Sequence, residues 1–408
     1  MMSHRPSFDV ARAISPLGFD DFIHRHWAQE PLHISRNDAA FYADLFSLSD
    51  LDALLVQSRI TSRDLRVASK RSGLAYDAMH ALDRPEPLRN RGPQLGALHE
   101  AYRDGKSVIV EMRRLWPQVD HLSRSLEQTF RRGSSAELYL TPPRAQAFDV
   151  HFDLVEIFLL QLDGAKTWHV YDPIVEAPSS AHGDDRNCAD RVGDPKWVFE
   201  VRAGDLLYIP YGFPHQGLTS GESSLHISFG VKRLHLHDVL KTVVDLAARD
   251  HALLRRSLQG KFADLGGPSL EADVDECLRL LRGGTLVERA IEQIEDSFLA
   301  DLDQAPDGQF AEIDGLDRID AGTLLERRAD QLCIVRCQGG SATLRFVEGG
   351  VSGPSWLEEP FRWIAATPRF RPAEIPGDMG GDGKLVLARR LVKEGLLRKA
   401  RDAADGAS

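Results

Sequence analysis

Short apolar runs separated by turn residues fill the middle of the chain, from about residue 136 to residue 233. They are rich in β-branched and aromatic residues, and each is too short for a long helix. The runs cover residues 138–140, 155–162, 166–171, 197–201, 206–210 and 224–233. Several short strands joined by turns are typical of a double-sheet jelly roll of the cupin type. Asp163-Gly164 predicts a hairpin turn between the second and third runs.

Apolar residues on both sides of this region recur every three to four positions, which predicts helices. Before it, the pattern places helices in the segment that precedes Pro31, from Ser49 onward, near 94–103 and near 117–130. After it, residues 236–258 and 270–300 are predicted to form two long amphipathic helices. These two helices can dock on the barrel or pair with another chain.

The last hundred residues have a pattern of their own. The predicted order is helix, strand, strand, helix, at 321–329, 333–338, 343–346 and 383–394. This order is similar to that of a winged helix. We therefore predict an α+β protein with three domains: residues 1–233, a barrel with N-terminal helices; 234–309, a helical segment; and 310–408, a winged helix.

Composition narrows the class of protein. With 408 residues, 42% hydrophobic and 27% charged, the chain has enough material for several cores. A formal net charge of −11 argues against a general nucleic-acid binder, and we interpret the basic run 389–401 as a solvated helix face or as a scaffold for a substrate. Four scattered cysteines fit a reducing cytoplasm better than a disulfide scaffold. With no secretory signal and no apolar stretch near 18 residues, a cytoplasmic location and no membrane contact are expected.

The candidate chemistry starts from His151-Phe152-Asp153 and the distant His215. On a strand, His151 and Asp153 would project from the same face, and His215 would return beside them at the end of a later strand. Two histidines and one carboxylate are the usual ligands of non-haem Fe(II) oxygenases, and they leave coordination positions open. Because H-x-D is common by chance, a hydrogen-bonded core histidine is the alternative for His151.

A lysine completes this hypothesis. A 2-oxo acid could take two open metal positions and O2 the third, and a cation is then needed for the far carboxylate of 2-oxoglutarate. Lys166, two residues past Gly164, is placed for this role. Its alternative is a solvated hairpin lysine. His226 and Ser228 share a strand face and are candidates for the pocket wall.

These motifs carry a resemblance to a known family. The chain resembles the JmjC ribosomal oxygenases of the cupin-4 group in residues 138–143, 151–153, 158–164, 166–168, Tyr171, 204–210, 212–213 and 215–216, and in its opening Phe22, Trp27 and Pro31-Leu32. The resemblance implies a JmjC barrel, a helical dimerisation segment and a winged helix. It implies that His151, Asp153 and His215 bind iron, that Lys166 anchors the carboxylate of 2-oxoglutarate, and that Tyr139 lines the same pocket and could hydrogen-bond the cosubstrate. Of the two pocket-wall candidates given by strand alternation, Ser228 is the better one for a contact with 2-oxoglutarate.

The function implied by the resemblance is that of an Fe(II)- and 2-oxoglutarate-dependent dioxygenase. Such an enzyme hydroxylates an arginine or histidine side chain of a ribosomal protein, and a homodimer is expected. Two departures lie near the expected entry of the target: Glu137 replaces a common asparagine, and Leu154 a common acidic residue. Glu137 could contact a cationic target such as a guanidinium, or it could be an exposed strand-edge glutamate.

Other functions stay open at this point. An oxygenase could act on a peptide natural product instead of a ribosomal protein. A cupin that binds zinc or manganese could perform non-oxidative chemistry, and an adaptor protein could use the winged helix alone. The polar loop 178–195 is interpreted as a mobile lid or a substrate-binding loop.

Overall fold

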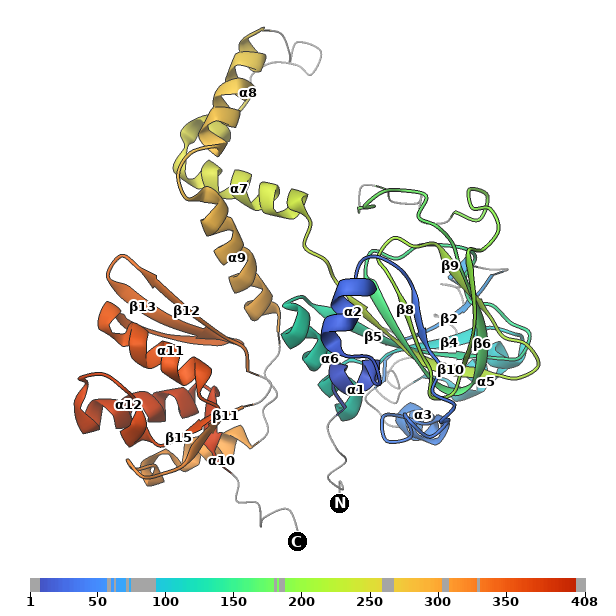
Figure 1. Cartoon of the computed structure of the whole chain (residues 1–408), viewed down its shortest axis with the longest axis horizontal. Helices are drawn as coiled ribbons and strands as arrows, with labels where there is room; N and C mark the ends of the chain where they lie inside the picture. The colour runs from blue at the N-terminus through green and yellow to red at the C-terminus, as the bar shows by residue number, and fades with distance from the viewer. Residues whose placement is uncertain are drawn as a thin grey trace. The chain divides into compact units, whose positions relative to one another are not determined.

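A computed structural model describes residues 8–56, 60–61, 64–70, 73–74, 93–179, 182, 188–258, 268–302, 308–328 and 331–400. The chain divides into two compact units, Met1–Arg233 and Leu234–Ser408 (Figure 1). Among the helices described, none combines the length and apolar character needed to cross a bilayer.

The first unit is built on antiparallel strands that pair in the order β1-β8-β6-β10-β5-β4-β2-β3, with β7 and β9 also paired to β6. The strands are β1 Leu32–Ile34, β2 Leu65–Ser69, β3 Gly73–Leu74, β4 Ser107–Glu111, β5 Ser134–Thr141, β6 Glu156–Val170, β7 Trp197–Arg202, β8 Leu206–Ile209, β9 His215–Leu218 and β10 Ser224–Val231. Their non-sequential order is that of a jelly-roll barrel rather than of a meander.

Strand β6 runs unbroken through Asp163-Gly164, so the predicted hairpin is wrong. Its residues 156–164 pair with β10 and partly with β8, whereas residues 165–170 pair with β7 and β9. Gly164 has φ +63°, and a Cβ there would lie 1.9 Å from the carbonyl oxygen of Ser223. The glycine is thus needed for a close backbone approach where β6 changes neighbours, and not for a chain reversal.

Helices cover one face of this sheet. The helices are α1 Val10–Ile14, α2 Phe19–Arg25, α3 Leu48–Val56, α5 Leu95–Arg103 and α6 Pro117–Phe130. The last four confirm the helices expected before the barrel. On β5, Ala136 and Leu138 are fully buried in the core that includes α6, while Glu137 and Tyr139 line a cavity on the opposite face. The period-two alternation of a strand therefore separates packing residues from site residues.

The helices at the start of the second unit differ from the prediction. Helix α7 (Leu236–Asp250) is shorter than expected, and the predicted helix 270–300 is two helices, α8 (Pro268–Leu281) and α9 (Leu286–Asp301). Gly283-Gly284 separates them, and Gly284 has φ +65°. A left-handed glycine ends a helix more readily than it continues one.

The rest of the second unit contains two three-stranded sheets, β15-β11-β16 and β12-β13-β14. Its elements are α10 Gln309–Asp314, β11 Leu325–Arg327, β12 Cys333–Gln338, β13 Ser341–Phe346, β14 Gly349–Pro354, α11 Glu358–Ala366, β15 Arg369–Phe370, α12 Gly380–Lys393 and β16 Leu397–Lys399. Strands β12 and β13 and helix α12 confirm three predicted elements.

The predicted helix 321–329 is wrong. The Asp320 carboxylate accepts hydrogen bonds from the backbone N–H of Gly322 (2.9 Å) and the hydroxyl of Thr323 (2.8 Å), which makes a turn. Leu325–Arg327 then form β11 between β15 and β16. Local side-chain bonds and strand pairing therefore override the helical spacing of the leucines.

Candidate metal centre

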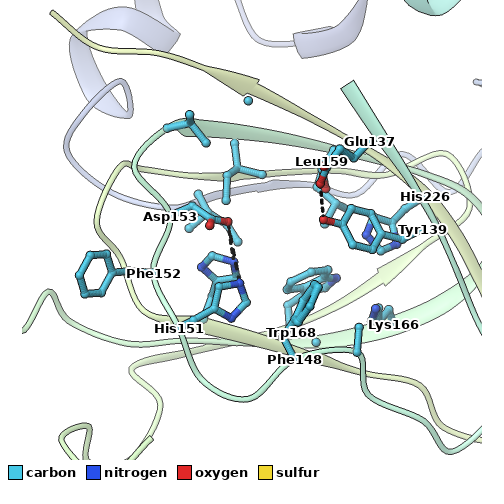
Figure 2. Close-up of a pocket in the computed structure, with 18 of the residues that line it drawn as sticks. Glu137, Tyr139, Phe148, His151, Phe152, Asp153, Leu159, Lys166, Trp168 and His226 are labelled. Carbon is cyan, nitrogen blue, oxygen red and sulfur yellow. Dashed lines mark hydrogen bonds and ion pairs between the residues drawn. The ribbon is translucent and has the colours of Figure 1, made fainter. Parts of the chain in front are cut away.

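The barrel face opposite the helices encloses a cavity of about 770 Å³. Residues from β5, β6, β9 and β10 line it, together with the segment 147–155 that leads into β6. Figure 2 shows the side chains that converge there, with His151 and Asp153 on one side and Tyr139, His226 and Lys166 on the other. The predicted site residues therefore share one hollow.

His151, Asp153 and His215 lie together in this cavity. The Nε2 atoms of His151 and His215 are 3.9 Å and 3.7 Å from Asp153 Oδ2, and one ligand atom from each residue lies within 4.8 Å of the others. Neither His151 nor Asp153 is in a strand, so the predicted face-sharing on a strand is wrong. Instead, His151 and His215 form an isolated β-bridge, with N–H···O distances of 2.8 Å and 3.2 Å.

Backbone carbonyls orient both imidazole rings. His151 Nδ1 donates to the Asp149 carbonyl (2.8 Å), and His215 Nδ1 donates to the Phe213 carbonyl (3.0 Å). Each Nε2 therefore carries a lone pair toward the centre, as in histidines that ligate metals. Burial, with a smaller contribution from His151, lowers the pKa of His215 to about 4, so this ring is neutral at physiological pH. The donor set fits a divalent transition metal.

Lys166 lies inside the same cavity, only 3% exposed. Its Nζ donates to the Thr141 hydroxyl (3.1 Å) and lies 5.2 Å from the centroid of the Trp168 ring. No ion pair between Lys166 and a described carboxylate is formed, and burial lowers the pKa of Lys166 to about 7. The alternative of a solvated hairpin lysine is therefore wrong. A buried cation without a counterion suits an anionic ligand.

Tyr139 on β5 and His226 and Ser228 on β10 line the same cavity as Lys166. The Tyr139 ring is parallel to the His226 ring, with centroids 5.0 Å apart and an interplanar angle of 4°. Burial, followed by the positive charge of Lys166, lowers the pKa of His226. Its Nδ1 has no hydrogen-bond partner in the described protein. Ser228 lies beside Glu137 in the strand register.

The structure gives Glu137 a role that neither prediction anticipated. Its carboxylate accepts a hydrogen bond from the Tyr139 hydroxyl (2.6 Å) and forms an ion pair with Arg66 Nη2 at 2.5 Å (Figure 2 shows the bond to Tyr139). Arg66 is on β2, two strands away and 71 residues distant in the chain. Burial by itself would lower the pKa of Arg66, but the charge and hydrogen bond of Glu137 outweigh it, so the pKa of Arg66 is raised. No local sequence signal could have found this pair.

Two further expectations have mixed outcomes. Leu154 packs in a separate apolar cluster with Phe152 and Tyr171, and it is not among the residues that line the cavity. The proposed lid 178–195 lies partly outside the described residues. Its described end is joined to the site, since the backbone N–H of Cys188 donates to the Val150 carbonyl (3.0 Å) next to His151.

A second cluster of possible metal ligands, His235, His237 and Asp238, lies at the start of α7. His235 and Asp238 form a capping box, in which each side chain accepts a backbone N–H of the other residue. His235 and Asp238 therefore already serve the helix terminus.

Comparison with known proteins shows which family the barrel resembles. Residues 109–239 match the family described as JmjC domain. Ribosomal oxygenase 1 of Homo sapiens is 32% identical over 268 residues, which are 62% of this chain and 40% of that protein. The bifunctional lysine-specific demethylase and histidyl-hydroxylase NO66 of Culex quinquefasciatus is 30% identical over 248 residues, 59% of this chain and 37% of that protein. The chain thus spans about 40% of the length of these curated relatives.

Solved structures show the same fold over nearly the whole chain. The X-ray structure of E. coli ycfD has a TM-score of 0.54 at 18% identity and covers 93% of this chain and 98% of its own. A structure described as YcfD, a ribosomal oxygenase from Escherichia coli, in complex with cobalt and 2-oxoglutarate has a TM-score of 0.52 at 17% identity, with 94% and 98% coverage. At this identity the similarity establishes the fold alone.

Proposed function

We propose that this protein, whose residues 109–239 form a JmjC domain, is an Fe(II)- and 2-oxoglutarate-dependent oxygenase. It hydroxylates a peptidyl side chain, arginine or histidine, of a ribosomal protein. The observation that carries the proposal is one cavity that holds both the His151–Asp153–His215 cluster and the uncompensated Lys166. The cluster alone would suit many metal-binding cupins, but the buried lysine adds a place for a carboxylate.

The residues have distinct tasks in this proposal. His151, Asp153 and His215 hold the metal, and Lys166 Nζ receives the far carboxylate of 2-oxoglutarate. When bound, the iron supplies the redox chemistry that couples O2 and the 2-oxo acid to oxidation of a C–H bond. The Thr141 hydroxyl holds Lys166 toward the cavity, and the apolar walls at Trp168 and Leu159 exclude water from the reacting groups.

The names of the relatives support the choice of substrate. Curated relatives are named ribosomal oxygenases or histidyl-hydroxylases, and a solved structure with this fold is described as a ribosomal oxygenase with 2-oxoglutarate. A ribosomal target also agrees with a cytoplasmic location, which we propose for this chain.

The test has two parts. Protein purified without oxygen and loaded with Fe(II) should convert 2-oxoglutarate to succinate once O2 is admitted, and zinc- or manganese-loaded protein should not. Mass spectrometry of ribosomal proteins from deletion and wild-type cells should then find a peptide that gains one oxygen atom only in the wild type. Absence of iron-dependent succinate would contradict the oxygenase proposal and leave a non-oxidative cupin or an adaptor.

We further propose that the helical segment pairs with a second copy of the chain. Leu236, Leu240 and Val244 on α7 are 74%, 54% and 38% exposed, and their four-residue spacing forms one apolar stripe. An exposed stripe of this kind favours a helix–helix contact. Light scattering should report a dimer for the native protein and a monomer for the double variant Leu240→Glu, Val244→Glu.

The domain division 1–233, 234–309 and 310–408 remains our proposal, with the last part as a winged helix. Support comes from helix α12, which lies between β15 and β16 in sequence, while β11 joins these two strands in a sheet. The net charge of −11 does not favour nucleic acid as its partner. A role in holding a protein substrate is more consistent with that charge.

A further inference from the structure

Most of the charged side chains that line the cavity form ion pairs with one another. Among the described residues, six lysine, arginine, aspartate and glutamate side chains line it: Arg66, Lys70, Lys166, Glu137, Asp149 and Asp153. Arg66 is ion-paired with Glu137 at 2.5 Å, and Lys70 with Asp149 at 3.1 Å. Among these six described residues, Lys166 and Asp153 are the two that form no ion pair with another of the six.

The proposed function uses both of these remaining charges. Asp153 would face the metal, and Lys166 would face the cosubstrate carboxylate. No lining carboxylate is then left to neutralise a cationic target side chain. A guanidinium or ammonium that leaves water without a counterion is strongly disfavoured.

The wall beside the metal nevertheless offers hydrogen-bond acceptors. The Tyr139 hydroxyl donates its proton to Glu137, and its oxygen accepts from Arg66, so the acceptors left for a target are those of Glu137 and Ser228. The Glu137 carboxylate and the Ser228 hydroxyl lie on the same strand faces. The wall can therefore receive an N–H group without supplying net negative charge.

We propose that the target side chain is uncharged and bears an N–H group, and that Arg66, together with Lys70, sets this preference by neutralising the wall. The inference rests on the proposed function and narrows its substrate class. Arg66 lies outside the segment 109–239 that matches the JmjC family, so this neutralisation comes from the chain's own N-terminal part.

Peptide capture tests the preference without turnover. Full-length protein is loaded with Fe(II) and 2-oxoglutarate without oxygen and is mixed with peptide pools that share random flanks but differ in one fixed central residue. Arginine and citrulline form a matched pair of similar shape and different charge, as do lysine and acetyl-lysine, and a histidine pool is added. We expect the neutral member of each pair to be retained at least about tenfold more than the charged member.

Variants separate charge balance from structure. Arg66→Met leaves Glu137 uncompensated and should shift retention toward the arginine pool by about tenfold. The double variant Arg66→Met, Glu137→Gln is neutral again and should return to the wild-type ratio. A structural role for Arg66 would change both variants alike. Lys70→Met releases Asp149 in a more exposed pair, with side chains 49% and 34% exposed, and should shift retention in the same direction by less.

Two results would overturn the proposal. One is wild-type protein that retains the arginine pool as well as the citrulline pool, and the other is an unchanged ratio in both Arg66→Met and Lys70→Met. Succinate formation is measured on the same preparation once O2 is admitted. Its absence would contradict the oxygenase function, whereas the capture ratio reports the charge preference independently of turnover.

Discussion

Lys166 and Arg66 are cations of one cavity, but the chain surrounds them differently. Lys166 is 3% exposed, and its described partner is the neutral hydroxyl of Thr141. The Arg66 side chain is 31% exposed and shares an ion pair with Glu137. Burial lowers the pKa of Lys166 to about 7, whereas the net pKa shift of Arg66 is upward because of Glu137.

This difference suits Lys166 to binding an anionic ligand and Arg66 to neutralising the charge of Glu137. An uncompensated buried cation destabilises the ligand-free protein, and a bound carboxylate can remove that penalty. A cation that already has a counterion, such as Arg66, gains no such stability from a ligand. It changes the electrostatic potential at the neighbouring groups instead. The buried part of the cavity around Lys166 can therefore bind an anionic ligand, whereas the charges on the wall formed by β5 and β2 are already paired.

Loss of a proposed metal ligand should have the largest effect. Asp153→Ala removes the single carboxylate of the cluster, and succinate formation should fall by more than about 100-fold, since even outer partners of metal ligands change activity 10–100-fold. Metal content and succinate are measured together. Asp172→Ala, which removes an exposed carboxylate paired with Lys196, serves as the control. Normal turnover by Asp153→Ala would refute the metal site.

Lys166→Met should weaken binding and strengthen the fold. Loss of the charge should reduce affinity for 2-oxoglutarate by about 2–5 kcal/mol. The free energy of unfolding should stay level or rise by up to about 4 kcal/mol, because an apolar side chain replaces a buried charge. Calorimetric titration and urea unfolding measure the two quantities. Unimpaired affinity, or a loss of stability of several kcal/mol, would show that Lys166 is structural.

The pH dependence gives a third test of Lys166. Because burial lowers its pKa from 10.5 to about 7, the carboxylate must bind together with a proton above pH 7. The dissociation constant should then rise about tenfold per pH unit. The folded protein lacks this proton between about pH 7 and 10.5 while the unfolded chain holds it, so the stability from this group rises with pH in that window. Lys166→Arg should flatten the binding profile in a titration series.

The smallest effect on stability is expected where the charges of the cavity wall are already paired. Lys70→Met breaks a pair whose side chains are 49% and 34% exposed, so the free energy of unfolding should change by less than about 1 kcal/mol. Urea unfolding of this variant beside Lys166→Met tests the contrast. A loss of several kcal/mol in Lys70→Met would mean that the two regions do not differ in the way described.

Sequence patterns predict structure that depends on residues close together in the chain, and they fail where distant residues decide. Apolar spacing identified α2, α3, α5, α6 and α12, because helix formation depends on neighbours within one or two turns. The same reasoning placed a hairpin at Asp163-Gly164, where β6 in fact continues, since a glycine also serves close approach by Ser223. The tight-turn signal was local, but its meaning depended on a strand sixty residues away.

The sequence by itself determined the chemistry that is possible: an H-x-D motif with a later histidine, a lysine past Gly164, and apolar runs short enough for a barrel. Only the tertiary structure decided which charges meet. The bridge between His151 and His215 and the pair Arg66–Glu137 join residues more than sixty positions apart. Strand order and register set such meetings, and burial then sets how strongly each charge acts, so neither can be read from neighbouring residues.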